Sequence, residues 1–568
     1  MSRFDGGAAA SRDMTLGRLV GAVLVEQGIA DLFCIPGDFT MQLSRELLQT
    51  DGLSLRTMSH EYGTTLAALG YAVGRRVPGA VCFTYGVGVL NATNGIAQAY
   101  VERVPLIVLS GAPGQRERDA PVFLHHTVVD DDTQYRVMRE VTAHQVRISD
   151  PHRALAQLRE AVAVALAQSR PVYVEIPRDL YLAPVRYTPA PRLAAPPPAY
   201  SQPAWDAAHA TLALLRAARQ PVLVPGLEIK RYDLAAPVTR IVETLALPWV
   251  ASPMSRIALS PDHPNYRGVY AGPASPAQVT RELLADCDAL LLLGEPNSDV
   301  NMGIASAIPA GQLVQAYDGV VRVGRETYPA ATADFVTALA EISRPRDGGL
   351  PDLRREQKPF LLPQPVHEAP DTDAPDDEAL TPYHVIDELN RHFAAHPDTT
   401  LVVDCGDAFF MSLGMFPADV LTSSLYMSMG IAVPGALGYQ LGSGRRPVVL
   451  VGDGAFHMTG QELMHARQAG VSPIVIVLNN QRWTSLSADD ADESLTRQAA
   501  LDFAALAQCY GVPGLTATRT GQLREHLAYA LTRDEPVLID AQVDPTQRSY
   551  LCERFFDAIK NQQHLPRL

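Results

Sequence analysis

The chain has 568 residues, with 47 Lys and Arg against 62 Asp and Glu, so its formal net charge is −15. A nucleic acid or an anionic membrane surface attracts clustered basic residues, so this negative charge disfavours both as partners. It excludes neither an enzyme nor a scaffold. Hydrophobic residues make up 47% of the chain, which excludes intrinsic disorder, and at roughly 150 residues per domain the length predicts three or four domains.

The cysteines and the N-terminus bear on the compartment. Six cysteines lie far apart without a C-x-x-C pair, which predicts neither a zinc site nor a disulfide framework and favours a reducing environment. Residues 1–14 carry charged side chains and lack the apolar stretch of a secretory signal, and no run of about 18 apolar residues occurs. We therefore expect a cytoplasmic protein that does not enter a membrane.

Two stretches without hydrophobic periodicity divide the chain. Residues 186–202 contain three consecutive prolines, and residues 344–379 are rich in proline and acidic side chains. Each could be a long loop inside one domain, but structureless segments of this length are uncommon there, so both are predicted to be linkers. The expected domains are 12–185, 203–343 and 380–568.

The first domain begins with a predicted helix. Thr15 is a suitable N-cap, apolar residues from Leu16 onwards fall on one face, and Gly28 can end the helix. Short apolar runs bounded by glycine or proline then predict buried parallel strands. These runs are Leu32–Ile35, Ala80–Thr84, Leu106–Leu109 and Val172–Ile176.

The other two domains show the same alternation. Predicted strands are Val222–Val224, Ala289–Leu293, Leu401–Val403, Val448–Val451, Ile474–Leu478 and Val537–Ile539. Strands that alternate with helices predict an α/β fold of three doubly wound domains with mostly parallel sheets. Ligands of such sheets bind beyond the carboxyl ends of the strands, so polar residues at those ends are the candidates for function.

Two strand ends carry a metal-binding pattern. Gly452-Asp453-Gly454-Ala455 follows one predicted strand, ahead of a helix in which Thr459 and Glu462 have the spacing of a capping box. Asn480 follows the next strand. Alone, the first pattern could be a tight turn, but adjacent strands would bring Asp453 and Asn480 together. Carboxylate and amide oxygens suit Mg²⁺ or Ca²⁺, and so few protein ligands imply that phosphate groups of a cofactor complete the site.

This pair of motifs resembles the Gly-Asp-Gly and Asn-Asn motifs of thiamine diphosphate enzymes. Between about Thr15 and Ala541 the chain is similar to the family of thiamine diphosphate-dependent pyruvate, indolepyruvate and phenylpyruvate decarboxylases, and most similar to the phenylpyruvate type. The resemblance implies thiamine diphosphate and Mg²⁺ as cofactors. It also implies that 12–185 binds the cofactor's pyrimidine, that 203–343 is a middle domain, and that 380–568 binds the diphosphate.

The resemblance assigns four catalytic residues: Asp38, Glu61, His125 and His126. It implies that Glu61, as a buried carboxyl group, bonds the pyrimidine ring, although a carboxylate at a helix start also complements the helix dipole. The histidine pair is typical of the decarboxylases and can titrate near neutrality, as proton transfer requires. In isolation, two histidines would more often belong to a solvated loop.

Further residues are implied to contact the cofactor. Met429 matches the apolar side chain over which the cofactor bends, although a methionine at such a position could simply belong to the core. Cys405 is expected at a strand end near the cofactor and not as a nucleophile. The implied contact residues are Glu61, Thr84, Cys405, Asp407, Met427, Met429, Gly452, Asp453, Gly454, Ala455 and Asn480.

The pattern departs from that of pyruvate decarboxylases after Asn480. Arg482 replaces a glycine whose backbone carbonyl binds the metal, so the role remains open to it, whereas Leu486 replaces a catalytic glutamate. Trp483 and Leu486 would enlarge the pocket or make it more apolar, which predicts an aryl or long-chain 2-oxo acid as substrate. Asp299 resembles a middle-domain aspartate of the phenylpyruvate type, with a loop cap as an equal alternative.

The implied reaction is decarboxylation of a 2-oxo acid to an aldehyde and CO₂. Two alternatives stay open. The first is a carboligase of the acetolactate-synthase or acyloin-forming kind, and bound FAD would favour the acetolactate-synthase kind. The second is a non-catalytic cofactor-binding protein. In the family, active sites lie between subunits, so a homodimer or homotetramer is expected.

Overall fold

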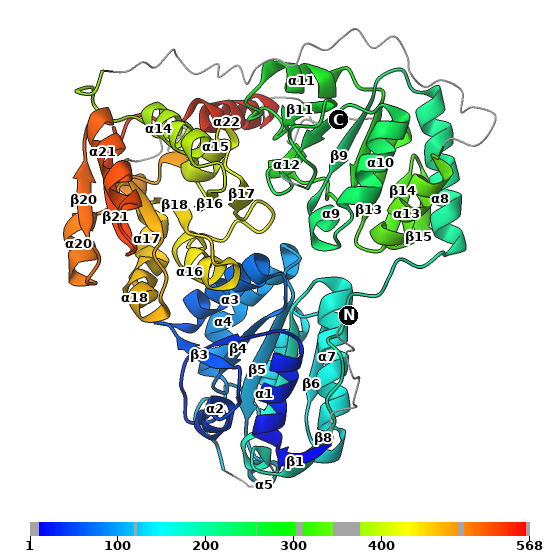
Figure 1. Ribbon diagram of the computed structural model, residues 1–568, viewed down its shortest axis with the longest axis vertical. Helices are drawn as coiled ribbons and strands as arrows, with labels where there is room; N and C mark the ends of the chain where they lie inside the picture. The colour runs from blue at the N-terminus through cyan, green and yellow to red at the C-terminus, as the bar shows by residue number, and fades with distance from the viewer. Residues whose placement is uncertain are drawn as a thin grey trace, which may run out of the picture. The chain divides into compact units, whose positions relative to one another are not determined.

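The computed structural model describes residues 11–118, 122–256, 258–302, 310–344, 375–486 and 493–563 (Figure 1). Its chain forms two compact units. The first consists of residues 1–196, 433–445 and 459–471, and the second of residues 197–432, 446–458 and 472–568. Most of the predicted linker 344–379 lies outside the described residues.

The first unit contains a parallel sheet of six strands in the order β3-β2-β4-β5-β7-β6. The four predicted strands of this region are β2, β4, β5 and β7. The edge strands β3 and β6 were not predicted because their residues are polar and partly exposed. The bounds are β2 Asp31–Cys34, β3 Ser54–Thr57, β4 Gly79–Phe83, β5 Leu106–Ala112, β6 His144–Arg147 and β7 Val172–Pro177, with a separate antiparallel pair β1 Arg12–Thr15 and β8 Pro184–Tyr187.

Helices cover this sheet. The helices are α1 Leu16–Glu26, α2 Met41–Leu48, α3 Glu61–Arg75, α4 Val87–Val101, α5 Gln115–Arg118, α6 Thr133–Arg139, α7 Ala154–Gln168, most of α16 Ala432–Ser443, and α18 Ala466–Ala469. Thr15 caps α1 as predicted, because its hydroxyl accepts the Arg18 amide at 3.3 Å, and Gly28 follows the helix with φ of 81°.

Two small residues allow α16 to lie directly on α3. A Cβ at Gly438 would lie 1.8 Å from the Ala67 carbonyl oxygen, and one at Gly70 would lie 2.0 Å from the Gly435 carbonyl oxygen. Because any side chain there would separate the helices, the glycines set their distance. This packing holds α3 in place, and the first residue of α3 is Glu61.

The second unit contains two sheets. One has the order β11-β10-β9-β12-β13-β14-β15 and the other the order β17-β16-β18-β19-β21-β20. Their strands are β9 Pro221–Pro225, β10 Trp249–Ala251, β11 Tyr266–Val269, β12 Ala289–Leu293, β13 Leu313–Tyr317, β14 Val320–Val323, β15 Glu326–Pro329, β16 Thr400–Val403, β17 Asp419–Leu421, β18 Pro447–Gly452, β19 Ile474–Asn479, β20 Gly514–Ala517 and β21 Val537–Gln542.

The described strand pairs of the second unit are parallel except for β13–β14 and β14–β15. The longer helices are α8 Gln202–Ala217, α10 Ala235–Leu245, α11 Gln278–Ala285, α13 Thr332–Ile342, α14 Pro382–Ala395, α21 Thr520–Leu531 and α22 Tyr550–Gln563. The shorter ones are α9 Leu227–Arg231, α12 Asp299–Met302, α15 Asp407–Leu413, α17 Asp453–Thr459, α19 Glu493–Thr496 and α20 Phe503–Cys509. The predicted α/β class with mostly parallel sheets is confirmed.

The structure corrects the predicted capping box. Helix α17 begins at Asp453, Thr459 makes no side-chain capping bond, and Glu462 lies in the following 3₁₀ turn, Gly460–His465. The Glu462 carboxylate instead accepts the Ser59 amide at 2.9 Å, just before α3. A tertiary contact therefore uses the side chain that the local pattern assigned to a cap.

Candidate active site

Three neighbouring strands of the first unit end in polar residues. Asp38 follows β2, Thr84 follows β4, and Glu61 begins the helix after β3. We call Asp38, Glu61, Thr84, His125 and His126 the first half-site. Gly37 is required for this arrangement, because a Cβ there would lie 2.4 Å from Cβ of Thr84. The strand order thus gathers residues that are far apart in sequence at one sheet edge.

Asp38 contacts both histidines. His125 Nε2 lies 2.5 Å from Asp38 Oδ2, His126 Nδ1 lies 4.0 Å from Oδ1, and the Thr84 hydroxyl donates to Oδ1 at 3.3 Å. Partial burial acts in the opposite direction, but the contacts with His125 and His126 lower the pKa of Asp38. Since the Asp38 and His125 side chains are 47% and 59% exposed, the pair can exchange protons with solvent or a bound substrate.

The backbone around Tyr85 and Gly86 holds His126. His126 has φ of 71°, and its Nδ1 lies 3.1 Å from the Tyr85 carbonyl oxygen, to which a protonated Nδ1 donates. Gly86 has φ of 66°, and a Cβ there would lie 2.1 Å from the His126 carbonyl oxygen. The histidine loop therefore rests directly on the turn that follows β4.

Glu61 lies at the start of α3 and is half-exposed in this chain, so the expectation that it is buried is wrong for the chain taken by itself. Its Oε2 accepts a hydrogen bond from the Asn91 side-chain amide at 2.7 Å, and its backbone carbonyl accepts one from the Thr65 hydroxyl at 2.8 Å. Asn91, on α4, can orient the carboxylate, but these contacts do not exclude water from it.

The second unit forms a second half-site at the ends of β16, β18 and β19. We use this name for Asp404, Cys405, Met427–Gly430, Gly452–Ala455 and Asn480–Trp483. Strands β18 and β19 are parallel neighbours, with Gly452 opposite Leu478, so the predicted adjacency is confirmed. The Asp453 carboxylate accepts the Gly454 amide at 2.7 Å and the Gln481 amide at 2.6 Å, which joins the two strand ends.

This half-site fits a hard cation at Asp453 and Asn480. Burial raises the pKa of Asp453 to about 6, and a bound cation would favour the ionised carboxylate. The Asn480 side-chain oxygen accepts the Arg482 amide at 3.0 Å, and its second lone pair can serve as a ligand. The Arg482 carbonyl, also predicted as a ligand, accepts hydrogen bonds from Thr484, with the Thr484 amide 2.9 Å away.

The loop that carries Met429 is held by the end of β16. Asp404 is buried, and its carboxylate accepts the Gly430 amide at 2.9 Å and the Ala432 amide at 2.8 Å. The Cys405 thiol donates to the Ser428 carbonyl at 3.4 Å. Together they fix both sides of Met429. Burial raises the pKa of Asp404, but these amides stabilise its charge.

Of the other predicted residues, Trp483 lies against the Gly-Asp-Gly turn, because a Cβ at Gly454 would be 2.3 Å from its ring. Leu486 is 66% exposed. The Asp407 carboxylate binds the Ser549 amide at 3.0 Å, which ties α15 to the segment before α22. Asp299 is exposed, and its carboxylate accepts the Val300 amide at 3.0 Å, while the Ser298 hydroxyl accepts the Asn301 amide at 3.1 Å.

Sequence reasoning did not find the supporting contacts of Asp404, Glu462, Gln134 and Glu175. Each is buried, and each contacts backbone or side chains at least 26 residues away. Asp404 had a signal, since a carboxylate that follows a buried strand requires partners. Glu175 also had one, since a carboxylate inside the predicted strand Val172–Ile176 requires partners too.

Three family descriptions match the chain. Residues 14–137 match the N-terminal TPP binding domain of thiamine pyrophosphate enzymes, residues 208–333 the central domain, and residues 404–541 the C-terminal TPP binding domain. Fold and half-sites thus define a thiamine diphosphate enzyme, and binding of this cofactor is the property that the two outer domains share.

The curated relatives narrow the class. The chain is 33% identical over 567 residues to indole-3-pyruvate decarboxylase from Azospirillum brasilense, covering 98% of this chain and 100% of the relative. It is 28% identical over 551 residues to a probable pyruvate decarboxylase of Schizosaccharomyces pombe, covering 94% and 95%. Pyruvate decarboxylase isozyme 2 of Saccharomyces cerevisiae is 26% identical over 488 residues, covering 83% and 84%.

The chain belongs to the family of thiamine diphosphate-dependent 2-oxo acid decarboxylases, which are carboxy-lyases.

Proposed function

We propose that this enzyme uses thiamine diphosphate and Mg²⁺ to decarboxylate an aryl or otherwise bulky 2-oxo acid to an aldehyde and CO₂. The observation that carries the proposal is the contact of Asp38 with His125 at 2.5 Å in a half-site that also holds Glu61 at a helix start. Ionisable groups such as those of Asp38, His125 and Glu61 are needed to deliver the proton that replaces the substrate's carboxylate.

In the proposal the two half-sites have different tasks. Asp453 and Asn480 would hold Mg²⁺ against the diphosphate, and Gly452 leaves room, since a Cβ there would meet nothing within 4 Å. Glu61 would bond the pyrimidine, while Met427 and Met429 would support the bend of the cofactor. When bound, thiamine diphosphate supplies the nucleophilic carbon that adds to the keto group and accepts the electrons left by CO₂.

The residues of the first half-site would act on substrate protons. His125 Nε2 shares a hydrogen bond with Asp38 Oδ2, so this pair would orient the substrate carboxylate and supply a proton to the reacting carbon. His126 Nδ1 contacts the Tyr85 carbonyl, which leaves Nε2 free of that contact and able to carry a proton. Thr84 would keep Asp38 in this orientation.

The proposed substrate class follows from the residues after Asn480. Trp483 lies against Gly454, and Leu486 stands where pyruvate decarboxylases have a catalytic glutamate. Indole-3-pyruvate decarboxylase, at 33% identity, supports a bulky substrate. Both side chains are apolar enough to favour an aromatic or long side chain over the methyl group of pyruvate.

The test is a CO₂-release screen with thiamine diphosphate and Mg²⁺ across pyruvate, a branched 2-oxo acid, phenylpyruvate and indolepyruvate. We expect kcat/KM to be highest for an aryl substrate and the product to be the aldehyde. A preference for pyruvate would refute the substrate class. A hydroxyketone as the main product would refute the product assignment and favour carboligation.

We also propose that the enzyme is a homodimer or homotetramer with active sites between subunits, and that it is cytoplasmic. Exposed apolar side chains flank the histidine pair, namely Val122, Phe123, Val128 and Val129. Light scattering after size exclusion would test the assembly, and a monomer with full activity would refute it.

The six cysteines are free thiols, which suits a reducing compartment. Among the described residues, none of the helices has the length and apolar character needed to cross a bilayer.

A further inference from the structure

The loop that carries His125 and His126 runs between α5 and α6, and both of its ends reach one buried carboxylate. Glu175 lies on β7 with none of its side chain exposed. Arg118, the last residue of α5, donates to its Oε1 at 3.4 Å, and Gln134 of α6 donates to its Oε2 at 2.9 Å. A single side chain of the sheet thus anchors the loop before and after the histidines.

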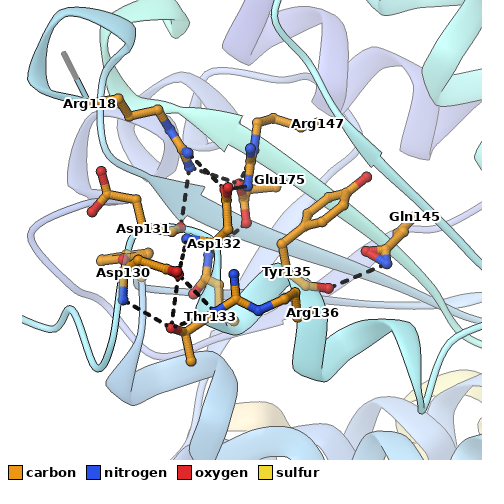
Figure 2. Close-up of polar contacts among 12 residues, drawn as sticks. Arg118, Asp130, Asp131, Asp132, Thr133, Tyr135, Arg136, Gln145, Arg147 and Glu175 are labelled. Carbon is orange, nitrogen blue, oxygen red and sulfur yellow. Dashed lines mark hydrogen bonds and ion pairs between the residues drawn. The ribbon is translucent and has the colours of Figure 1, made fainter.

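A second carboxylate closes a ring of ion pairs around this anchor (Figure 2). Asp132, just before α6, accepts a hydrogen bond from Arg118 Nη1 at 2.9 Å and forms an ion pair with Arg147 Nη2 at 2.7 Å. Arg147, on β6, also donates to Glu175. The two arginines and two carboxylates balance in charge, and loss of either arginine leaves the buried Glu175 carboxylate with fewer partners.

Gln134 links this ring to the histidines. It is 1% exposed; its Oε1 accepts the Gly86 amide at 2.7 Å, and its Nε2 donates to the Gly111 carbonyl at 3.1 Å as well as to Glu175. Gly86 lies against the backbone of His126, where even a Cβ would collide. The path therefore runs from Glu175 through Gln134 and Gly86 to His126.

Asp131 and Thr127 add a second connection. The Asp131 carbonyl accepts a hydrogen bond from Arg118 at 3.4 Å, and its side chain accepts one from the Thr127 hydroxyl, also at 3.4 Å. The Thr127 hydroxyl in turn lies 3.3 Å from the Tyr85 hydroxyl. The residue after His126 is thus tied to the same arginine and to the residue next to Gly86.

We propose that Glu175 and Gln134 are positioning residues that set the distance of His125 and His126 from Asp38. This inference rests on the proposed role of the histidines in substrate proton transfer. Neither residue touches the substrate in this account. Gln134 acts through the Gly86 amide, and Glu175 acts through the side chains of Gln134 and Arg118. A displacement of the loop by about 1 Å suffices to lower turnover by about 100-fold.

The experiment compares Glu175→Gln and Gln134→Met with Glu140→Gln in the full-length enzyme loaded with thiamine diphosphate and Mg²⁺. Glu140 is exposed, follows α6 and, among the described residues, forms an ion pair with the neighbouring Arg139, so it is a matched control. We expect kcat to fall about 10- to 100-fold in the two positioning variants, with KM and cofactor affinity within about threefold of the parent. The pH profile of kcat should change shape, and the control should match the parent.

A substitution swap separates positioning from folding. Gln134→Glu alone places two carboxylates at the 2.9 Å contact, whereas Gln134→Glu combined with Glu175→Gln restores a donor facing an acceptor. We expect kcat of the double variant to be at least tenfold higher than kcat of Gln134→Glu alone. No recovery, with both proteins folded by circular dichroism, would overturn the inference, as would unchanged kcat and pH profile in Gln134→Met.

Ring-nitrogen NMR signals of the two histidines, recorded without substrate, distinguish this inference from the proposed function. If His125→Gln is fully active, the proposed function of the histidines fails. If His125→Gln is inactive while Gln134→Met and Glu175→Gln retain parental turnover and parental histidine signals, only the positioning inference fails. Should Glu175→Gln not fold, Gln134→Met carries the same test.

Discussion

The two half-sites satisfy their carboxylates in different ways. In the second half-site, Asp404 and Asp453 are buried, and backbone amides from neighbouring turns hold their oxygens. In the first half-site, Asp38 is 47% exposed, and its side-chain partners are two histidines and a threonine. Backbone amides only donate, whereas imidazole rings can both donate and accept a proton. We therefore expect the second half-site to bind the cofactor and the first to exchange protons.

The largest expected effect tests whether the first half-site governs turnover. Glu61→Gln keeps the shape of the side chain and can still bond Asn91, but an amide cannot exchange the proton that the proposed bond between Glu61 and the pyrimidine nitrogen would carry. We expect kcat to fall about 1,000-fold, with cofactor affinity changed far less. CO₂ release and calorimetry measure the two quantities. Glu160→Gln, at an exposed position of α7, is the control and should behave like the parent.

A somewhat smaller effect is expected at Asp38. Asp38→Asn removes the negative charge and one of the two acceptor oxygens of the side chain that shares a hydrogen bond with His125 at 2.5 Å, so proton delivery slows. We expect kcat to fall about 100-fold while thiamine diphosphate binds as before. Loss of cofactor binding in this variant would mean that the two half-sites do not divide the tasks as described.

The second half-site should show the opposite behaviour. Asp404→Asn places an amide group against the Gly430 and Ala432 amides, so one of them loses its acceptor and the loop around Met429 loosens. We expect about a tenfold loss of cofactor affinity, measured by calorimetry, and nearly parental kcat at saturating cofactor. A large fall in kcat with unchanged affinity would assign Asp404 to the chemistry.

The smallest expected effect concerns stability and not turnover. Burial raises the pKa of Glu462 to about 7, above the model-peptide value of 4.5, so the folded state binds the proton more tightly than the unfolded state. Stability therefore falls as pH rises from about 4.5 through 7, by about 3 kcal/mol at most. Glu462→Gln removes this dependence.

Thermal melting of the parent and of Glu462→Gln at pH 5, 6, 7 and 8 measures that difference. The advantage of the glutamine variant in Tm should grow with pH up to about 7 and then level off. Parallel Tm curves would show that Glu462 does not titrate in the folded protein. His465 Nε2, 3.6 Å from the carboxylate, is the other titratable group of this cluster.

Much of the architecture was predictable because local patterns and strand order agree. The Gly-Asp-Gly turn and Asn480 each follow an apolar strand, and parallel pairing of β18 with β19 then places them together without further information. Asp38 and Thr84 were assigned by the resemblance to the decarboxylases, and they follow β2 and β4. Edge strands such as β3 escaped prediction because exposure removes the apolar signal.

The supporting contacts were not predictable, since they depend on tertiary distances. Asp404 reaches amides 26 and 28 residues away, and Gln134 reaches Gly86 48 residues away. Glu462 kept the spacing of a capping box, yet its carboxylate binds Ser59, 403 residues away. Local spacing indicates which residues can cap a helix, but tertiary packing determines which partner the side chain binds.

The central claim is that Asp453 holds the cofactor through a divalent ion, and calorimetric titration tests it most directly. Thiamine diphosphate is titrated into the parent, Asp453→Asn and the control Asp544→Asn, with Mg²⁺ and again with EDTA. Asp544 is suitable because its carboxylate also bonds a turn just after a strand of the same sheet. We expect saturable binding of thiamine diphosphate with Mg²⁺ in the parent and the control. We expect no saturable binding with EDTA or in Asp453→Asn. Equal binding in all three proteins without Mg²⁺ would contradict it.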